Sequence, residues 1–151
     1  MKKVTMIAAT LLLAATTAIA ATFTSCDDDK PITIDKLPAA AQTFIKENFA
    51  REQVSYATVD RGLILDEYTV VFVSGTKLNF DNSGEWTEVD CRYSAVPQSI
   101  VPKQISEYVK AHHPNSDIIE LKREHNRWEA KITGGLELTF NSSFAVIEID
   151  D

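Results

Sequence analysis

Two stretches of this 151-residue chain resemble two later stretches in order and residue type, and this repetition constrains the fold most. Segment 37–49, LPAAAQTFIKENF, aligns with 101–113, VPKQISEYVKAHH. Segment 74–90, SGTKLNFDNSGEWTEVD, aligns with 134–150, GGLELTFNSSFAVIEID. The offset is 64 residues for the first pair and 60 for the second, so one connection in the second copy is four residues shorter. We therefore expect one duplicated domain over residues 37–151, with tandem repeats at about 37–95 and 96–151.

Each repeat is predicted to begin with a helix and to continue as antiparallel strands. Pro38 and Pro102 stand where a helix favours proline, and apolar residues follow each at helical spacing. Alternating apolar residues predict strands at 54–62, 65–75, 117–125 and 127–135, and hairpins at 76–91 and 136–150. We expect an α+β fold in which the two repeats form one sheet, with two helices on one face and the other face open to water.

Alternation along the predicted strands also assigns side chains to the two faces. Cys91 falls on the core side and is expected to be buried. Trp86 falls on the open side, where an exposed tryptophan would be a candidate anchor for a partner. The alternative is that Trp86 packs on Val71, on Val73 or on the nearby turn. The predicted partner-binding residues are Val71, Trp86, Glu88, Asp90, Lys131 and Thr139.

The N-terminal segment has the features of a secretory signal. Two lysines precede an uncharged run from Val4 to Phe23, which predicts a signal peptide over residues 1–25, with a membrane span as the alternative. FTSC at 23–26 resembles the lipobox of bacterial lipoproteins, which implies lipidation of Cys26. The following aspartates resemble an export signal of Bacteroidetes surface lipoproteins. The competing interpretation is cleavage after AIA at 18–20, which leaves Cys26 free or paired with Cys91. Residues 26–36 are polar and are predicted to form a tether.

Composition and spacing exclude several classes of function. Asp and Glu number 22 against 15 Lys and Arg, which argues against binding to nucleic acid. Adjacent His112 and His113 would point to different helix faces, and His125 is predicted to lie in a turn, so no metal site is expected. The pairs Glu88/Asp90 and Glu148/Asp150 could act as acids, but no cleft is indicated. We expect no enzymatic activity and no cofactor.

The helix LPAAAQTFIKENF, the hairpin KLNFDNSGEWTEVD and their second copies resemble the PepSY-like proteins of Bacteroidetes, which are similar in fold to the β-lactamase inhibitor protein. The resemblance covers residues 37–151. It implies an α+β fold and a non-enzymatic role, in which the open sheet face binds or inhibits a protein partner such as a peptidase or another enzyme. The alternative is an envelope structural or chaperone-like protein without a discrete ligand. We expect a location in the cell envelope, lipid-anchored to the outer membrane and either periplasmic or surface-exposed, with membrane contact through the anchor only.

Overall fold

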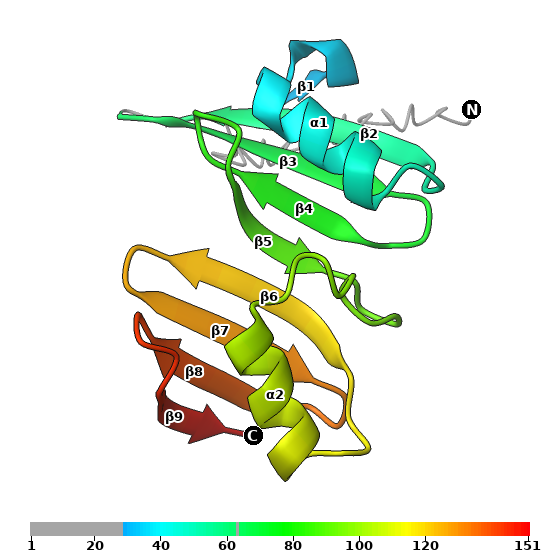
Figure 1. The fold of residues 1–151 in the computed structure, drawn as a ribbon. Helices are drawn as coiled ribbons and strands as arrows, with labels where there is room; N and C mark the ends of the chain where they lie inside the picture. Colours follow the sequence, from blue (N-terminus) through cyan, green and yellow to red (C-terminus); the bar gives the residue numbers. More distant parts are fainter. Residues whose placement is uncertain (1–28, 63) are drawn as a thin grey trace, which may run out of the picture.

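The computed structural model of the chain describes residues 29–62 and 64–151 (Figure 1). These described residues form two α-helices, a short 3-10 helix and nine strands. In chain order these are β1 (Asp29–Ile32), η1 (Ile34–Lys36), α1 (Ala39–Asn48), β2 (Val54–Arg61), β3 (Asp66–Phe72), β4 (Lys77–Phe80), β5 (Trp86–Asp90), α2 (Lys103–His112), β6 (Ile118–Glu124), β7 (Arg127–Ile132), β8 (Glu137–Asn141) and β9 (Val146–Asp150).

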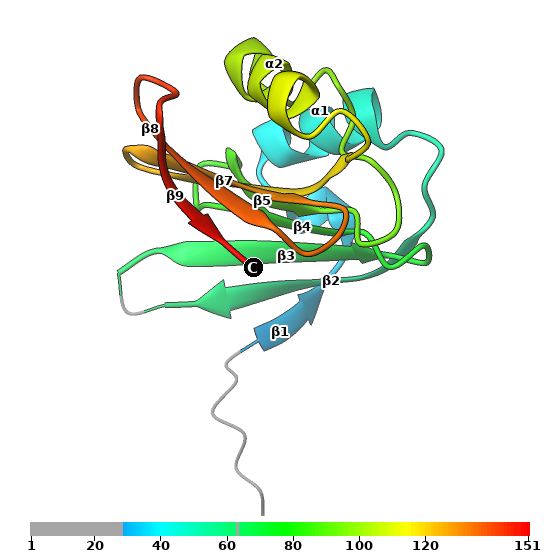
Figure 2. The same cartoon turned by 90° about the horizontal axis from the view of Figure 1, so that it is seen from below.

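All nine strands form one antiparallel sheet in which the spatial order follows the chain order. The middle of the sheet is the β5–β6 pair, where Val89 lies opposite Leu121. Both helices lie on the same side of the sheet, α1 over the first strands and α2 over the last (Figures 1 and 2). The prediction of an α+β fold with one antiparallel sheet and one open face is therefore confirmed. That the two halves are a tandem duplication stays a prediction.

The core is a layer of apolar side chains between the sheet and the helices. One row of register-matched residues crosses seven strands on the helix side, and each is 3% exposed or less. Ile105 of α2 is fully buried, and Ile45 of α1 also belongs to this core. Because the row continues through the β5–β6 pair, the two halves share a single core. The row consists of Ala57, Val70, Leu78, Val89, Leu121, Ala130 and Leu138.

Both helices begin directly after a proline, as predicted. Pro38 precedes α1 and Pro102 precedes α2, in each case with the backbone extended at the proline. Each helix is ten residues long and turns a buried stripe toward the sheet, with Ala41 and Ile45 in α1. A proline at a helix start costs no hydrogen bond, because the backbone N–H that it lacks would have had no acceptor within the helix.

The hairpin turns β4–β5 and β8–β9 have the same construction. Asp81 Oδ1 accepts hydrogen bonds from the backbone N–H groups of Ser83 and Glu85, at 2.9 and 3.0 Å. Asn141 Oδ1 accepts them from Ser143 and Ala145 at the same two distances. A short side-chain acceptor that satisfies two turn amides explains why Asp and Asn stand there.

The predicted tether is shorter than the sequence indicated. Residues 29–36 form β1 and η1, so the prediction that the chain is a tether through residue 36 was wrong for this part. β1 pairs with β2, and Pro31 lies opposite Thr58. A proline is tolerated on an edge strand because the missing N–H can lie on the unpaired side. Ile32 and Ile34 pack against the core, and the alternation of these two isoleucines is the sequence signal for a strand in this segment.

Candidate functional site: the open face of the sheet

The open face is the side of the sheet opposite the helices, and no described element covers it (Figure 2). Two adjacent rows of register-matched residues define it. The first row is Pro31, Thr58, Thr69, Asn79, Glu88, Lys122, Glu129, Thr139 and Glu148. The second row is Tyr56, Val71, Lys77, Asp90, Glu120, Lys131, Glu137 and Asp150.

Five of the six predicted partner-binding residues lie on this face. Val71, Asp90 and Lys131 belong to the second row, and Glu88 and Thr139 belong to the first. Thr139 is only 6% exposed, because it lies between Glu129 and Glu148 on neighbouring strands. Its neighbours therefore cover it, and it offers little exposed area to a partner.

Side chains near the middle of the open face are held in a hydrogen-bonded chain. Thr69 Oγ1 donates to Asn79 Oδ1 at 3.0 Å, and Asn79 Nδ2 donates to Glu88 Oε2 at 2.6 Å. Lys77 Nζ lies 3.1 Å from Glu88 Oε1, whose side chain is 13% exposed. Since both carboxylate oxygens have partners, Glu88 is fixed in position before any ligand arrives.

The open face carries an excess of negative charge. Its two rows contain seven carboxylates and three lysines. Lys122 Nζ lies 2.9 Å from Glu120 Oε1, and the hydrogen bond to Glu120 raises the pKa of the Lys122 ammonium. A face of this composition attracts a basic surface and repels an acidic one.

Trp86 does not lie on the open face, so its predicted placement was wrong. Asn79 lies opposite Glu88, but the next residue, Phe80, lies opposite Trp86, which leaves Thr87 as an extra residue in β5. This β-bulge shifts the alternation by one residue and turns Trp86 to the helix side. There it stacks on Phe44 of α1, with ring centroids 6.0 Å apart. The alternative partners predicted for Trp86, Val71 and Val73, lie on the other face of the sheet, so its packing on Phe44 was not foreseen.

Of the apolar residues on the open face, the sequence predicted Val71 but not its neighbours Tyr56 and Val73. Tyr56 lies opposite Val71 and is 53% exposed. Val73 continues the alternation of β3 just beyond its end and is 65% exposed. These three residues form an apolar group at one end of a charged surface. The tyrosine in the predicted strand 54–62 was the available signal, since tyrosine is enriched at binding hot spots.

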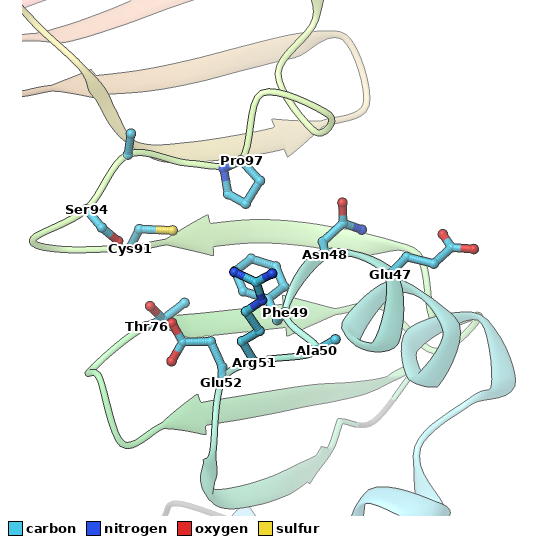
Figure 3. Close-up of a pocket in the computed structure, with 11 residues that line it drawn as sticks. Glu47, Asn48, Phe49, Ala50, Arg51, Glu52, Thr76, Cys91, Ser94 and Pro97 are labelled. Atoms are coloured by element: carbon cyan, nitrogen blue, oxygen red, sulfur yellow. The ribbon is translucent and has the colours of Figure 1, made fainter.

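Cys91 is 4% exposed, as predicted for a core position. It borders a pocket of about 300 Å³ between the end of α1 and the β5–α2 connection. Figure 3 shows its sulfur beside this pocket, with Arg51 and Glu52 at the rim. Burial raises the pKa of the Cys91 thiol to about 11, with a smaller contribution from Asp90. The thiol is therefore neutral at physiological pH and poorly suited to act as a nucleophile.

The remaining candidates form no chemical centre in the described part of the chain. His112 stacks on Tyr108 with centroids 4.1 Å apart, and its Nδ1 lies 2.9 Å from the Tyr108 carbonyl oxygen. Among residues 29–62 and 64–151, no three His, Cys, Asp or Glu residues are placed to hold a metal ion. No helix within these residues is long and apolar enough to span a membrane. The predicted signal peptide 1–25 and Cys26 lie outside the described residues.

Comparison with known proteins gives consistent matches. A family model described as "Putative beta-lactamase-inhibitor-like, PepSY-like" matches residues 66–148. A search of curated proteins finds no match.

Three solved structures are similar to the chain over most of its length. A "putative periplasmic protein" of the DUF2874 family from Bacteroides vulgatus is 42% identical, with a TM-score of 0.81, covering 83% of this chain and 99% of that one. A "putative calcium-regulated periplasmic protein" from Bacteroides thetaiotaomicron is 37% identical, with a TM-score of 0.80 and coverages of 83% and 98%. A periplasmic protein "of unknown function" from Bacteroides vulgatus is 30% identical, with a TM-score of 0.77 and coverages of 82% and 99%.

Proposed function

Because the chain belongs to the PepSY-like family, whose description is β-lactamase-inhibitor-like, we propose that it is a non-enzymatic envelope protein that binds a protein partner through its open sheet face. The observation that carries this proposal is the composition of that face. An apolar group at one end, Tyr56, Val71 and Val73, adjoins rows of charged side chains. An apolar anchor beside a polar surround is the usual composition of a protein interface.

The charge of the open face favours a partner with a basic surface. Seven carboxylates against three lysines would speed association with such a surface and disfavour an acidic one. Lys77, Asn79 and Glu88 are already held by one another, so little side-chain freedom is lost on binding. We propose that the partner is an enzyme, such as a peptidase, that the chain binds or inhibits.

The proposed location is the outer membrane, reached through a lipid on Cys26. The solved relatives are described as periplasmic proteins, which supports a location in the cell envelope. Residues 1–25 would be the signal peptide of a lipoprotein, and the acylated Cys26 would be the first residue of the mature chain. Mass analysis of the mature N-terminus tests this directly. A mature chain that starts at an unmodified Ala21 would contradict it.

We also propose that the two halves arose by duplication. A ten-residue helix precedes four strands in each half. The register of each last hairpin shifts at an equivalent place, next to Phe80 in the first half and Phe140 in the second. Duplication would explain how two helices come to cover one sheet side by side.

Site-specific photo-crosslinking in intact cells tests the proposed binding face. The full chain is produced with p-benzoylphenylalanine in place of Tyr56, and separately in place of Tyr93 as a matched control. Tyr93 is 88% exposed and lies in the β5–α2 connection, outside the open face. We expect one envelope protein to be captured from position 56 and not from position 93. Capture from both positions alike, or from neither, would contradict the proposal.

A second candidate function has support from the predominance of charge on the open face. A surface with few apolar residues suits an envelope structural or chaperone-like protein that holds no discrete ligand. The same crosslinks separate the two candidates. A single partner captured at position 56 favours the binding module, whereas a broad set of unrelated envelope proteins favours the chaperone-like role.

A further inference from the structure

The tip of the β2–β3 hairpin carries two exposed aliphatic side chains. Ile64 is 90% exposed and Leu65 is 56% exposed, and neither belongs to the core cluster of the described residues. The chain folds back closely here, since a Cβ on Gly62 would lie 2.6 Å from the carbonyl oxygen of Leu65. Glycine is therefore required at residue 62. Ile64 and Leu65 are called the apolar tip below.

This hairpin is longer than its counterpart in the second half of the molecule. Val54 lies opposite Phe72 in the first half, and Ile118 lies opposite Ile132 in the second, so the first hairpin is four residues longer. This extension accounts for the change of offset from 64 to 60 between the aligned sequence segments. The shorter counterpart turns through the polar residues 125 and 126. The extra length and the apolar side chains thus occur in the same hairpin.

The N-terminal strand begins at the same end of the sheet as the apolar tip. Asp29, the first residue of β1, lies opposite Asp60, and the last pair before the tip is Arg61 with Asp66. Asp29 is the third residue after Cys26, and these three steps of chain span at most about 10 Å when extended. A lipid on Cys26 would therefore bring a bilayer within reach of the tip.

We propose that Ile64 and Leu65 enter the lipid bilayer beside the acylated Cys26 and form a second membrane contact. This inference rests on the proposed lipid anchor and adds to the contact through the anchor alone. Transfer of exposed aliphatic side chains from water to the acyl region of a bilayer is favourable. An acyl chain alone tethers a protein without fixing its orientation, and a second contact would fix it. The strand ends then point to the bilayer, and the open face stays accessible to a partner from the side.

The charges next to the apolar tip select the kind of lipid. Along the chain, Asp60, Asp66 and Glu67 flank it with Arg61. The groove that Leu65 lines adds Asp81 and Glu124 against Arg123 and Arg127, so five carboxylates face three guanidinium groups. Anionic headgroups would repel this surplus of carboxylates within a Debye length, whereas zwitterionic headgroups would not. The contact is therefore specific for the bilayer interior and for zwitterionic lipid, such as phosphatidylcholine or phosphatidylethanolamine.

A depth measurement on the reconstituted mature protein tests the inference. Ile64→Cys and the control Tyr93→Cys are each produced with the native N-terminal segment and labelled with an environment-sensitive fluorophore. Tyr93 is 88% exposed and follows the far end of β5. The buried Cys91, with its thiol pKa of about 11, does not compete for the label in the folded protein. In phosphatidylcholine vesicles that contain a spin-labelled quenching lipid, we expect loss of fluorescence at position 64 and none at position 93.

Each outcome decides a separate point. Unquenched fluorescence at position 64, on protein that still floats with the vesicles, would overturn the membrane contact and leave the lipid anchor standing. A mature chain whose mass shows no acyl groups would overturn both the anchor and this contact, while the open-face crosslinks would still test partner binding. Replacement of phosphatidylcholine by phosphatidylglycerol should weaken quenching at position 64, and stronger quenching would contradict the charge argument.

Discussion

At the scale of single residues, Trp86 shows how one extra residue in a strand changes the role of a side chain. Strict alternation places it with Glu88 on the open face, but the bulge at Thr87 turns it to the helices. There Phe44 stacks on one side of the indole, and the Arg123 guanidinium carbon lies 5.0 Å from the ring centroid. The residue that looked most like a binding anchor is instead part of the packing between α1 and the sheet.

Trp86→Ala is therefore expected to lower stability without weakening partner binding. Removal of a largely packed tryptophan should lower the free energy of unfolding by about 3 kcal/mol, measured by urea denaturation. Tyr56→Ala should have the reverse effect. Because this side chain is exposed, the free energy of unfolding should change by no more than about 0.5 kcal/mol, whereas the partner should no longer be captured. If Trp86→Ala left stability unchanged and abolished binding, the assignment of the two faces would be wrong.

Cys91 gives a pH-dependent prediction at the same scale. Its thiol pKa is raised from 9.0 to about 11 chiefly by burial, so the unfolded chain loses this proton at a lower pH than the folded one. The contribution of Cys91 to stability is complete below pH 9.0 and is lost as pH rises toward about 11. Urea denaturation at several alkaline pH values should show a steeper decline for the wild-type protein than for Cys91→Ala. Parallel declines would contradict the burial of this thiol.

At the scale of elements, local signals in the sequence were sufficient for most of the fold. Prolines before apolar stripes place both helices, and alternation with Asp81 and Asn141 in the turns places the hairpins. β1 was missed because a charged segment with a proline looks like a tether. The bulge was missed because it depends on cross-strand pairing, which alternation along a single strand does not report. The missed bulge in β5 explains the misplaced Trp86.

The contact between the β4–β5 turn and α1 depends on Gly84. Its φ is +87°, and a Cβ there would lie 2.7 Å from the Pro38 Cβ and 2.9 Å from the Ala41 nitrogen. Gly84→Ala adds this clash to the strain of the left-handed backbone, so we expect a loss of more than about 2 kcal/mol in thermal or urea unfolding. Gly75→Ala is the control, with φ of +92° and only an ordinary contact at 3.8 Å. If both variants lost the same free energy of unfolding, the close contact between α1 and the β4–β5 turn would not contribute to stability.

At the scale of the whole molecule, two features define what the protein can do: one continuous core, and one sheet face that none of the described elements covers. Val89 and Leu121, paired across the middle of the sheet, are both fully buried, so the two halves stabilise one another. The position of the open face could be predicted from the sequence. Alternation along the strands alone placed five of the six predicted partner-binding residues on it. Its apolar group was not predictable in full, because Tyr56 gains its place beside Val71 only through pairing of β2 with β3.

The central claim is that the open face, with its negative charge, is the surface that binds a partner. The most direct test is the dissociation constant of the partner captured through Tyr56, measured for two charge-reversal variants of equal net charge. Glu148→Lys/Asp150→Lys alters the open face at exposed positions of β9, and Glu47→Lys/Glu107→Lys alters the exposed side of the two helices. We predict that the dissociation constant rises by about tenfold or more for the first variant and stays unchanged for the second. Equal changes, or a change confined to the helix variant, would contradict the account.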